Sequence, residues 1–167
     1  TQDRLSILAA CEDPTTVATY NYAGEKWPLP QTGQMWLEYE LLNNPDLPGV
    51  FCVSTSYRNE KNPIPGRHEI IFPMFEFESK GLLDDLRLLE QELCEALGFG
   101  DRESFHHQVY DDMSARYNTP ELNSEHERRM HEEFGPVFFL ERFPLRTSPF
   151  WNMRKNGSHA HKIDVIL

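Results

Sequence analysis

Ser56-Tyr-Arg-Asn-Glu60 is followed by Gly66-Arg-His68 and then by Ile71-Phe-Pro-Met-Phe-Glu-Phe-Glu78, and these segments decide the fold. Residues 50–58 and 69–78 are rich in β-branched and aromatic side chains, which is typical of strands. The segment between them contains two prolines and a glycine, which exclude a helix or a central strand there. The pattern therefore predicts an antiparallel hairpin with a long connecting loop.

Residues two apart in a strand share a face, so Arg58 is expected beside Ser54 and Ser56. The return strand places four further side chains on one face, namely Phe72, Met74, Glu76 and Glu78. An arginine fork suits phosphate, an aromatic ring offers a stacking surface for a base, and a carboxylate can hold an ammonium group. This face predicts a site for a nucleotide beside a small ligand. The alternative is the solvated side of a half-exposed sheet.

The order of these residues resembles motif 2 of the class II aminoacyl-tRNA synthetases, in the branch that handles aspartate, asparagine and lysine. Leu29–Glu38 resembles the amino-acid-binding turn of that family. Asn123–Glu127 and Phe134–Pro144 are similar to segments of asparaginyl-tRNA synthetases, and Lys162–Leu167 looks like the strand that carries a metal-binding aspartate. The resemblance covers the chain from about Cys11 to Leu167.

The resemblance implies an ATP site. Arg58 would contact the α-phosphate as the catalytic residue, and His68 would bind the outer phosphates. Arg67 would also bind ATP. Glu60 would meet the adenine amino group, and Phe72 would stack on the adenine ring.

The resemblance also implies that Gln34 and Glu76 hold the amino acid, with Glu76 on its α-ammonium group, and that Asp164 helps to bind Mg²⁺. The reaction would be attack of the substrate carboxylate on the α-phosphate of ATP, giving an aminoacyl adenylate and pyrophosphate. Such catalysis depends on positioning and on cations that stabilise phosphate charge.

Position 37 bears on the choice of amino acid. Aspartate-specific members of the family carry a lysine three residues after the binding glutamine, whereas this chain has Leu37. Leu37, together with Glu rather than Asp at position 76, resembles the asparagine branch. The alternative is that Leu37 is an ordinary core residue of a helix over 34–42.

Composition limits the setting. The 167 residues have a net charge of -11, which disfavours a broad tRNA-binding surface because nucleic-acid affinity rests on Lys and Arg. The three cysteines, Cys11, Cys52 and Cys94, lack the spacing of a metal site or a disulfide framework. With no N-terminal apolar segment and no apolar run of about 20 residues, we expect a cytoplasmic protein outside the membrane.

The resemblance is incomplete at the C-terminal side. The family follows the Asp164 strand with a Gly-rich segment, a second metal-binding acid and motif 3, and it carries an N-terminal anticodon-binding barrel. These do not occur in residues 1–167. We expect one partial class II synthetase-like domain, either a fragment or a free-standing paralogue.

Three helices are expected after the hairpin. Leu82, Leu86, Leu89, Leu93 and Leu97 fall at helical spacing through 81–97 and are expected to pack on a sheet, with a partner-binding face as the alternative. Asp101 is expected to cap a helix containing Phe105, Val109 and Met113. Ser124 and Glu127 predict a capping box for a helix ending at Gly135.

A strand is expected over 137–143, and a second in the segment 162–167. His159 and His161 are two residues apart in a segment that is expected to form a flexible loop. The alternative is that the two histidines bind a transition metal.

The predicted fold is α+β, an antiparallel sheet flanked by helices. Three functions are compatible with the sequence: an asparaginyl-type tRNA ligase core, a paralogue that passes an activated amino acid to another acceptor, as asparagine synthetases derived from the family do, and a non-catalytic binding module. The family is usually dimeric, so a homodimer is expected.

Overall fold

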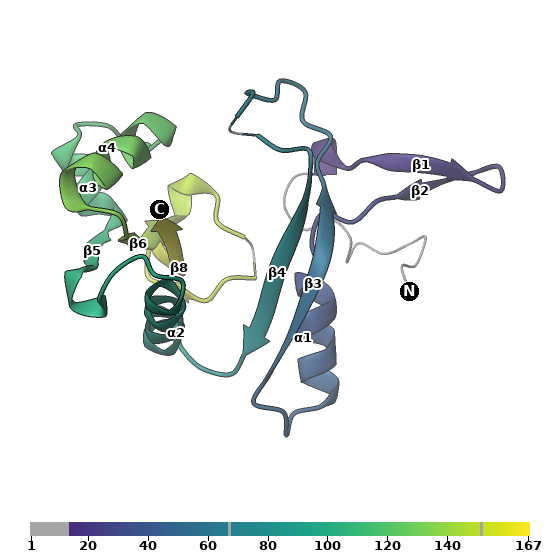
Figure 1. Cartoon of the computed structure of the whole chain (residues 1–167), viewed down its shortest axis with the longest axis horizontal. Helices are drawn as coiled ribbons and strands as arrows, with labels where there is room; N and C mark the ends of the chain where they lie inside the picture. Colours follow the sequence, from purple (N-terminus) through teal and green to yellow (C-terminus); the bar gives the residue numbers. More distant parts are fainter. Residues whose placement is uncertain (1–13, 67, 151) are drawn as a thin grey trace. The chain divides into compact units, whose positions relative to one another are not determined.

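The computed structural model describes residues 14–66, 68–150 and 152–167. The chain divides into two compact units, Thr1–Lys80 (unit 1) and Gly81–Leu167 (unit 2), and each is described by itself. Helices and strands together confirm the α+β class (Figure 1). In the described residues the strands form sheets of two, two and four members. The interpretation of residues 1–167 as one synthetase-like domain stays a prediction.

Unit 1 is built on the predicted hairpin. Its strands run antiparallel, with Gly49 opposite Ser79 and Tyr57 opposite Ile71, and α1 lies along them (Figure 1). A second, smaller hairpin precedes α1. The elements are η2 (Pro14–Thr16), β1 (Thr19–Tyr22), β2 (Glu25–Pro28), α1 (Gln34–Asn43), β3 (Gly49–Tyr57) and β4 (Ile71–Ser79).

The two faces of the β3–β4 hairpin differ. Ser56 and Glu76 are buried on the face that meets α1. On the other face Phe51 and Phe75 are 70% and 56% exposed, with ring centroids 5.7 Å apart. The alternation predicted from the sequence is therefore present, but the exposed face is apolar, contrary to the solvated polar face of the alternative interpretation.

Unit 2 holds a four-stranded sheet in the order β5-β6-β8-β7. All its neighbours are antiparallel except β5 and β6, which run parallel. The chain passes through α3 and α4 between these two strands, and parallel neighbours require such a crossover. The elements are α2 (Leu83–Ala96), η3 (Arg102–Ser104), β5 (His106–Val109), α3 (Tyr110–Arg116), α4 (Ser124–Phe134), β6 (Phe138–Pro144), η4 (Leu145–Thr147), β7 (Lys155–Asn156) and β8 (His159–Ile166).

The core of unit 2 lies on both sides of β6, because successive side chains of a strand point to opposite faces. Phe138 and Leu140 pack in one cluster with side chains of α3 and α4. Phe139 packs in the other with Cys94 of α2. The expected strand over 137–143 is confirmed as β6.

The prediction of a helix after Asp101 is wrong for the first half of that segment. Residues Arg102–Ser104 form a short 3-10 helix, His106–Val109 forms β5, and α3 begins only at Tyr110. Pairing of His106 with Phe138 satisfies the backbone as a strand, so a tertiary contact overrides the four-residue spacing of apolar side chains.

The third expected helix is confirmed as α4, but its cap is one residue earlier. The Asn123 side chain accepts hydrogen bonds from the N–H groups of Glu125 and His126, and the His126 ring accepts from the Asn123 N–H. The capping box is therefore Asn123 with His126, and not Ser124 with Glu127.

The predicted helix over 81–97 is confirmed as α2, but its leucine stripe does not face the sheet. Leu89, Leu93 and Leu97 are 39%, 41% and 65% exposed, whereas Leu86 and Cys94 face the core. The rotation of the helix follows from a bidentate ion pair between an inward arginine of α2 and a buried glutamate of β6, described below. The alternative of a partner-binding face therefore stays open.

His159 begins β8 rather than lying in a flexible loop. Asn156 pairs with His159, so Gly157 and Ser158 form a two-residue hairpin turn. Gly157 has a φ of 59°, which glycine adopts at little cost. Gly-Ser between two strands is a sequence signal for such a turn, and it was present in the chain.

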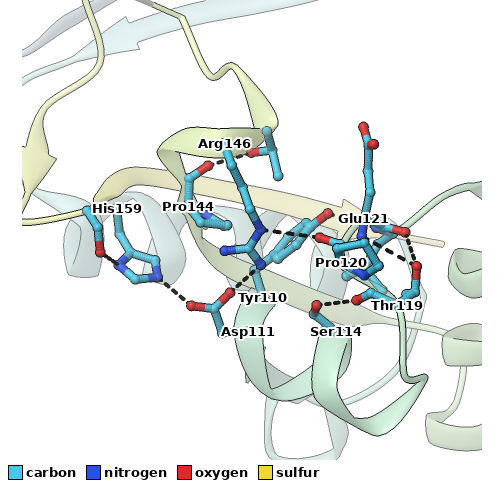
Figure 2. A network of polar contacts seen from close by, with 12 residues as sticks. Tyr110, Asp111, Ser114, Thr119, Pro120, Glu121, Pro144, Arg146 and His159 are labelled. Carbon is cyan, nitrogen blue, oxygen red and sulfur yellow. Dashed lines mark hydrogen bonds and ion pairs between the residues drawn. The ribbon is translucent and has the colours of Figure 1, made fainter.

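A polar network ties α3 to the C-terminal strands of unit 2 (Figure 2). Asp111 accepts a hydrogen bond from Arg146 at 2.6 Å and lies 2.8 Å from the His159 ring nitrogen Nε2. Arg146 also donates to the carbonyl of Pro120, and Ser158 contacts the other ring nitrogen of His159. Arg146 first, and then His159, hold the pKa of Asp111 below its usual range.

Replacing Asp111 with asparagine is expected to destabilise the protein at neutral pH by about 1 kcal/mol or less, because Asp111 is partly exposed. A lowered carboxylate pKa stabilises the fold above the unfolded pKa and ceases to do so as the pH falls through the folded pKa. The difference from wild type in urea unfolding should therefore vanish in acid. A difference that persists in acid would contradict the ionic origin.

Candidate functional site

A cavity of about 440 Å³ opens in unit 1 where β3 and β4 meet their connecting loop. It is lined by Arg58, Glu60, His68, Glu69 and Phe72. Four of these five were expected from the sequence to bind ATP. Its volume lies in the range of small-molecule sites.

Arg58 is held by its backbone and by its side chain. Its N–H donates to the carbonyl of Ile70 at 2.8 Å, and its Nε donates to Ser56 Oγ at 3.0 Å. The guanidinium carbon lies 6.0 Å from the centre of the Phe72 ring. The side chain is therefore directed toward the ring, as the strand alternation predicted.

On the loop side, the cavity is lined by one histidine and two glutamates. The Nδ1 atom of His68 accepts the N–H of Ile64 at 3.2 Å, so this ring nitrogen is unprotonated in that bond. Glu60 and Glu69 are exposed carboxylates on the same cavity. Glu69 was not expected from the sequence, where no signal beyond adjacency to His68 indicated it. Arg67 lies outside the described residues.

Glu76 is buried, with 8% of its surface exposed. Its Oε2 atom accepts the N–H of Gly33 at 2.7 Å and the hydroxyl of Ser54 at 2.8 Å, while Oε1 accepts the hydroxyl of Thr32. Three donors satisfy a buried carboxylate well. Glu76 therefore anchors the turn before α1 to the hairpin.

The same turn approaches the hairpin closely at Gly33, so a side chain there would require Cys52 or Glu76 to shift. A methyl group on Gly33 would lie 2.9 Å from the Cys52 sulfur and 3.1 Å from the Glu76 carboxylate. Burial, and then the charge of Glu76, raise the pKa of the Cys52 thiol. Thr32 and Gly33 were missed by the sequence interpretation, because their role arises from a contact between distant segments.

Gln34 begins α1 and is exposed. Its side chain hydrogen-bonds Glu78, whose pKa is raised chiefly by burial although that hydrogen bond opposes the rise. Gln34 and Glu78 therefore border the Glu76 anchor. Leu37 is only 7% exposed, which agrees with the core-residue alternative left open by the sequence.

Asp164 lies in β8 of unit 2. Its carboxylate lies 2.7 Å from Lys162 Nζ. The described residues contain no group of three or more His, Cys, Asp or Glu side chains arranged to hold a metal ion. One carboxylate supplies fewer oxygen ligands than the octahedral Mg²⁺ ion takes, so Asp164 alone does not complete such a site. Magnesium binding at Asp164 stays a prediction.

A buried charged cluster lies between α2 and β6. Arg87 donates to both carboxylate oxygens of Glu141, and His107 Nδ1 lies 3.3 Å from one of them. Burial acts to raise the pKa of Glu141, but Arg87 and then His107 outweigh it and hold this pKa below its usual range. Nearby, burial and then the charges of Asp164 and Glu141 raise the pKa of Glu90 to about 7. No sequence pattern indicated this cluster, because its members lie far apart in the chain.

Replacing Glu90 with glutamine is expected to stabilise the protein by about 2 kcal/mol once the carboxylate is ionised, allowing for its partial exposure. A raised carboxylate pKa favours the fold below the unfolded pKa and opposes it as the pH rises through about 7. Melting temperatures should coincide in acid and separate in mildly alkaline buffer. A variant less stable than wild type in alkaline buffer would contradict this account of Glu90.

Among the described residues, no helix has both the length and the apolar character needed to cross a membrane. No protein-family model matches the chain, and no curated protein matches it.

Three solved structures are similar to the chain. Asparaginyl-tRNA synthetase from Pyrococcus horikoshii, complexed with asparaginyl-adenylate, has a TM-score of 0.77 at 22% identity over 95% of this chain. The Entamoeba histolytica enzyme in complex with asparaginyl-adenylate has a TM-score of 0.73 at 22% identity over 90% of this chain. The Entamoeba histolytica enzyme in a further structure gives 0.75 at 23% identity over 93%.

The chain has an asparaginyl-tRNA synthetase-like fold. The resemblance to a class II synthetase core is thus confirmed at the level of the fold. The chain spans 43%, 42% and 42% of the lengths of these three proteins. At these identities the comparison shows a shared fold and does not assign an activity.

Proposed function

We propose that the protein activates an amino acid with ATP, forming an aminoacyl adenylate. The observation that carries the proposal is the unit 1 cavity, in which Arg58 is directed at the ring of Phe72. Support comes from the fold, which is shared with enzymes solved in complex with asparaginyl-adenylate.

In this proposal the adenine ring stacks on Phe72 and the guanidinium of Arg58 binds the α-phosphate. Arginine suits this role because its planar donors match phosphate oxygens and remain charged at all relevant pH values. The bond from Arg58 Nε to Ser56 fixes the side chain before substrate binds. Such preorganised charge stabilises the negative charge that develops during attack on phosphorus.

His68 and Arg67 would bind the outer phosphates, and Glu60 would accept from the adenine amino group. The bond from Ile64 to Nδ1 leaves Nε2 of His68 to carry the proton and donate to a phosphate oxygen. The substrate carboxylate would then attack the α-phosphate and release pyrophosphate.

The amino acid would lie beside Gln34 and Glu76, with asparagine or aspartate as the substrate class. Glu76 already accepts three hydrogen bonds, so its contribution includes fixing Thr32 and Gly33 as well as offering negative charge to an α-ammonium group. Substrate selection by Leu37 is not supported by its burial. The choice between the two amino acids rests on the asparaginyl-type fold alone.

The acceptor of the activated amino acid has two candidates. Transfer to tRNA would make the protein a tRNA ligase, and the fold favours this. Transfer to ammonia or another small acceptor is the second candidate, favoured by the net charge of -11. A homodimer and a cytoplasmic location, both expected from the sequence, stay predictions.

ATP–pyrophosphate exchange, measured separately with asparagine and aspartate, tests the proposal. We expect exchange that depends on one of the two amino acids. Absence of exchange with every amino acid, in protein shown to be folded, would favour a non-catalytic binding module instead. If exchange occurs, charging of tRNA by the same protein distinguishes the two acceptors.

A further inference from the structure

Unit 2 contains a second cavity, of about 250 Å³, that the proposed adenylation site does not use. Apolar side chains supply part of its wall, and three polar side chains, Arg142, Asn156 and His161, line it from β6, β7 and β8. The remaining lining residues are Leu82, Leu83, Asp84, His159 and Ala160. Its volume is just below the usual range for small-molecule sites, so it suits a ligand of few atoms.

A β-bulge brings Arg142 to this cavity. The register of β6 against β8 shifts between Glu141 and Phe143, where two residues of β8, His161 and Lys162, lie opposite the single residue Arg142. Its φ is 57°, in the left-handed region that non-glycine residues rarely occupy. Glu141 and Phe143 are both 6% exposed while Arg142 is exposed, so the bulge turns this one side chain out of the sheet.

The strain at Arg142 is not offset by contacts of its side chain. Within the described part of the chain, the Arg142 guanidinium makes no hydrogen bond and no ion pair. The side chains of Asn156 and His161 likewise have no polar partner there. A strained arginine with unused donors, beside two further polar groups in a cavity, points to an external acceptor.

The other charged groups of the cavity are already paired. Asp84 is on the rim with an 82% exposed side chain and accepts from Arg87 at 2.7 Å. Both ring nitrogens of His159 are engaged, by Asp111 and by Ser158. The unpaired charge that remains is that of Arg142, so the ligand is expected to be negative.

We propose that Arg142, Asn156 and His161 form a binding site for a small oxyanion, a phosphate or a carboxylate group. The guanidinium donates hydrogen bonds to two oxygens of the anion. The amide of Asn156 and the ring of His161 donate to its remaining lone pairs. This site is separate from the Arg58 cavity in its residues. It is also separate from Asp164, which does not line this cavity.

Calorimetric titration of the whole protein with inorganic phosphate and, separately, with acetate tests the proposal at low ionic strength. Arg142→Gln is expected to weaken binding by about tenfold or more. Arg128→Gln, which removes the same charge from the exposed surface of α4, should bind as wild type does. The anion that binds more tightly shows whether the site takes a phosphate or a carboxylate group.

Arg142→Gly separates binding from folding. Glycine adopts a positive φ without strain, so this variant should melt no lower than wild type while losing the anion. An Arg58→Ala variant should keep the binding that Arg142 provides. The proposal is overturned if wild type binds neither anion, if Arg142→Gly binds as wild type does, or if binding is lost with Arg58 and retained without Arg142.

Discussion

Arg58→Ala is expected to lower ATP–pyrophosphate exchange by about 100-fold or more, because a preorganised cation at the reacting phosphate contributes several kcal/mol. Arg58 is the cation whose side chain is fixed by Ser56 and directed at Phe72. Arg58→Lys should recover only part of the activity, because an ammonium group lacks the planar fork. The measurement is kcat/KM for exchange with the preferred amino acid.

The matched control for Arg58 is Arg128→Ala on the exposed surface of α4, where two ion pairs to Glu125 and Glu132 are lost without touching the cavity. It should retain wild-type exchange. If Arg58→Ala keeps more than half of the wild-type rate while the protein is folded by circular dichroism, the assignment of the α-phosphate to this arginine is wrong.

Glu76→Ala is expected to destabilise the protein by about 3 kcal/mol, because it leaves buried donors without their acceptor. The donors are the Thr32 hydroxyl, the Gly33 N–H and the Ser54 hydroxyl. Glu76→Gln should cost less, since its carbonyl oxygen still accepts, but its NH₂ group opposes at least one of the donors. Urea unfolding at neutral pH measures both variants.

The control for Glu76 is Glu69→Ala, an exposed carboxylate beside the Arg58 cavity. It should change stability by about 0.5 kcal/mol or less, as surface substitutions usually do. Stability of Glu76→Ala equal to wild type would show that the anchor between the hairpin and the turn before α1 is not needed. Loss of exchange without loss of stability in Glu76→Gln would instead favour direct contact with the amino acid.

The hairpin could be predicted because its strands alternate and its loop contains Pro and Gly. For the same reason the sequence placed Arg58, Ser56 and Phe72 on one face, and the structure brings them together. The helices α2 and α4 could be predicted because periodic apolar residues and capping signals lie within single segments. The hairpin and these helices could be predicted because each depends on residues that are close together in the sequence.

The features that were missed depend on contacts between distant segments. β5 is a strand because it pairs with β6, about 30 residues later in the chain. The rotation of α2 follows from the Arg87–Glu141 pair, and the anchor at Glu76 from its approach to Gly33. No local pattern announces such pairs. The Gly157-Ser158 turn is different, because its signal was local and was overlooked.

Binding of a non-hydrolysable asparaginyl-adenylate analogue, measured by calorimetry, tests the central claim most directly. An adenylation site should bind this analogue more tightly than ATP or asparagine alone, because the analogue spans both halves of the site. Arg58→Ala should weaken that binding by about tenfold or more. Failure of the folded protein to bind the analogue, or equal binding by wild type and Arg58→Ala, would contradict an adenylation site on the β3–β4 hairpin.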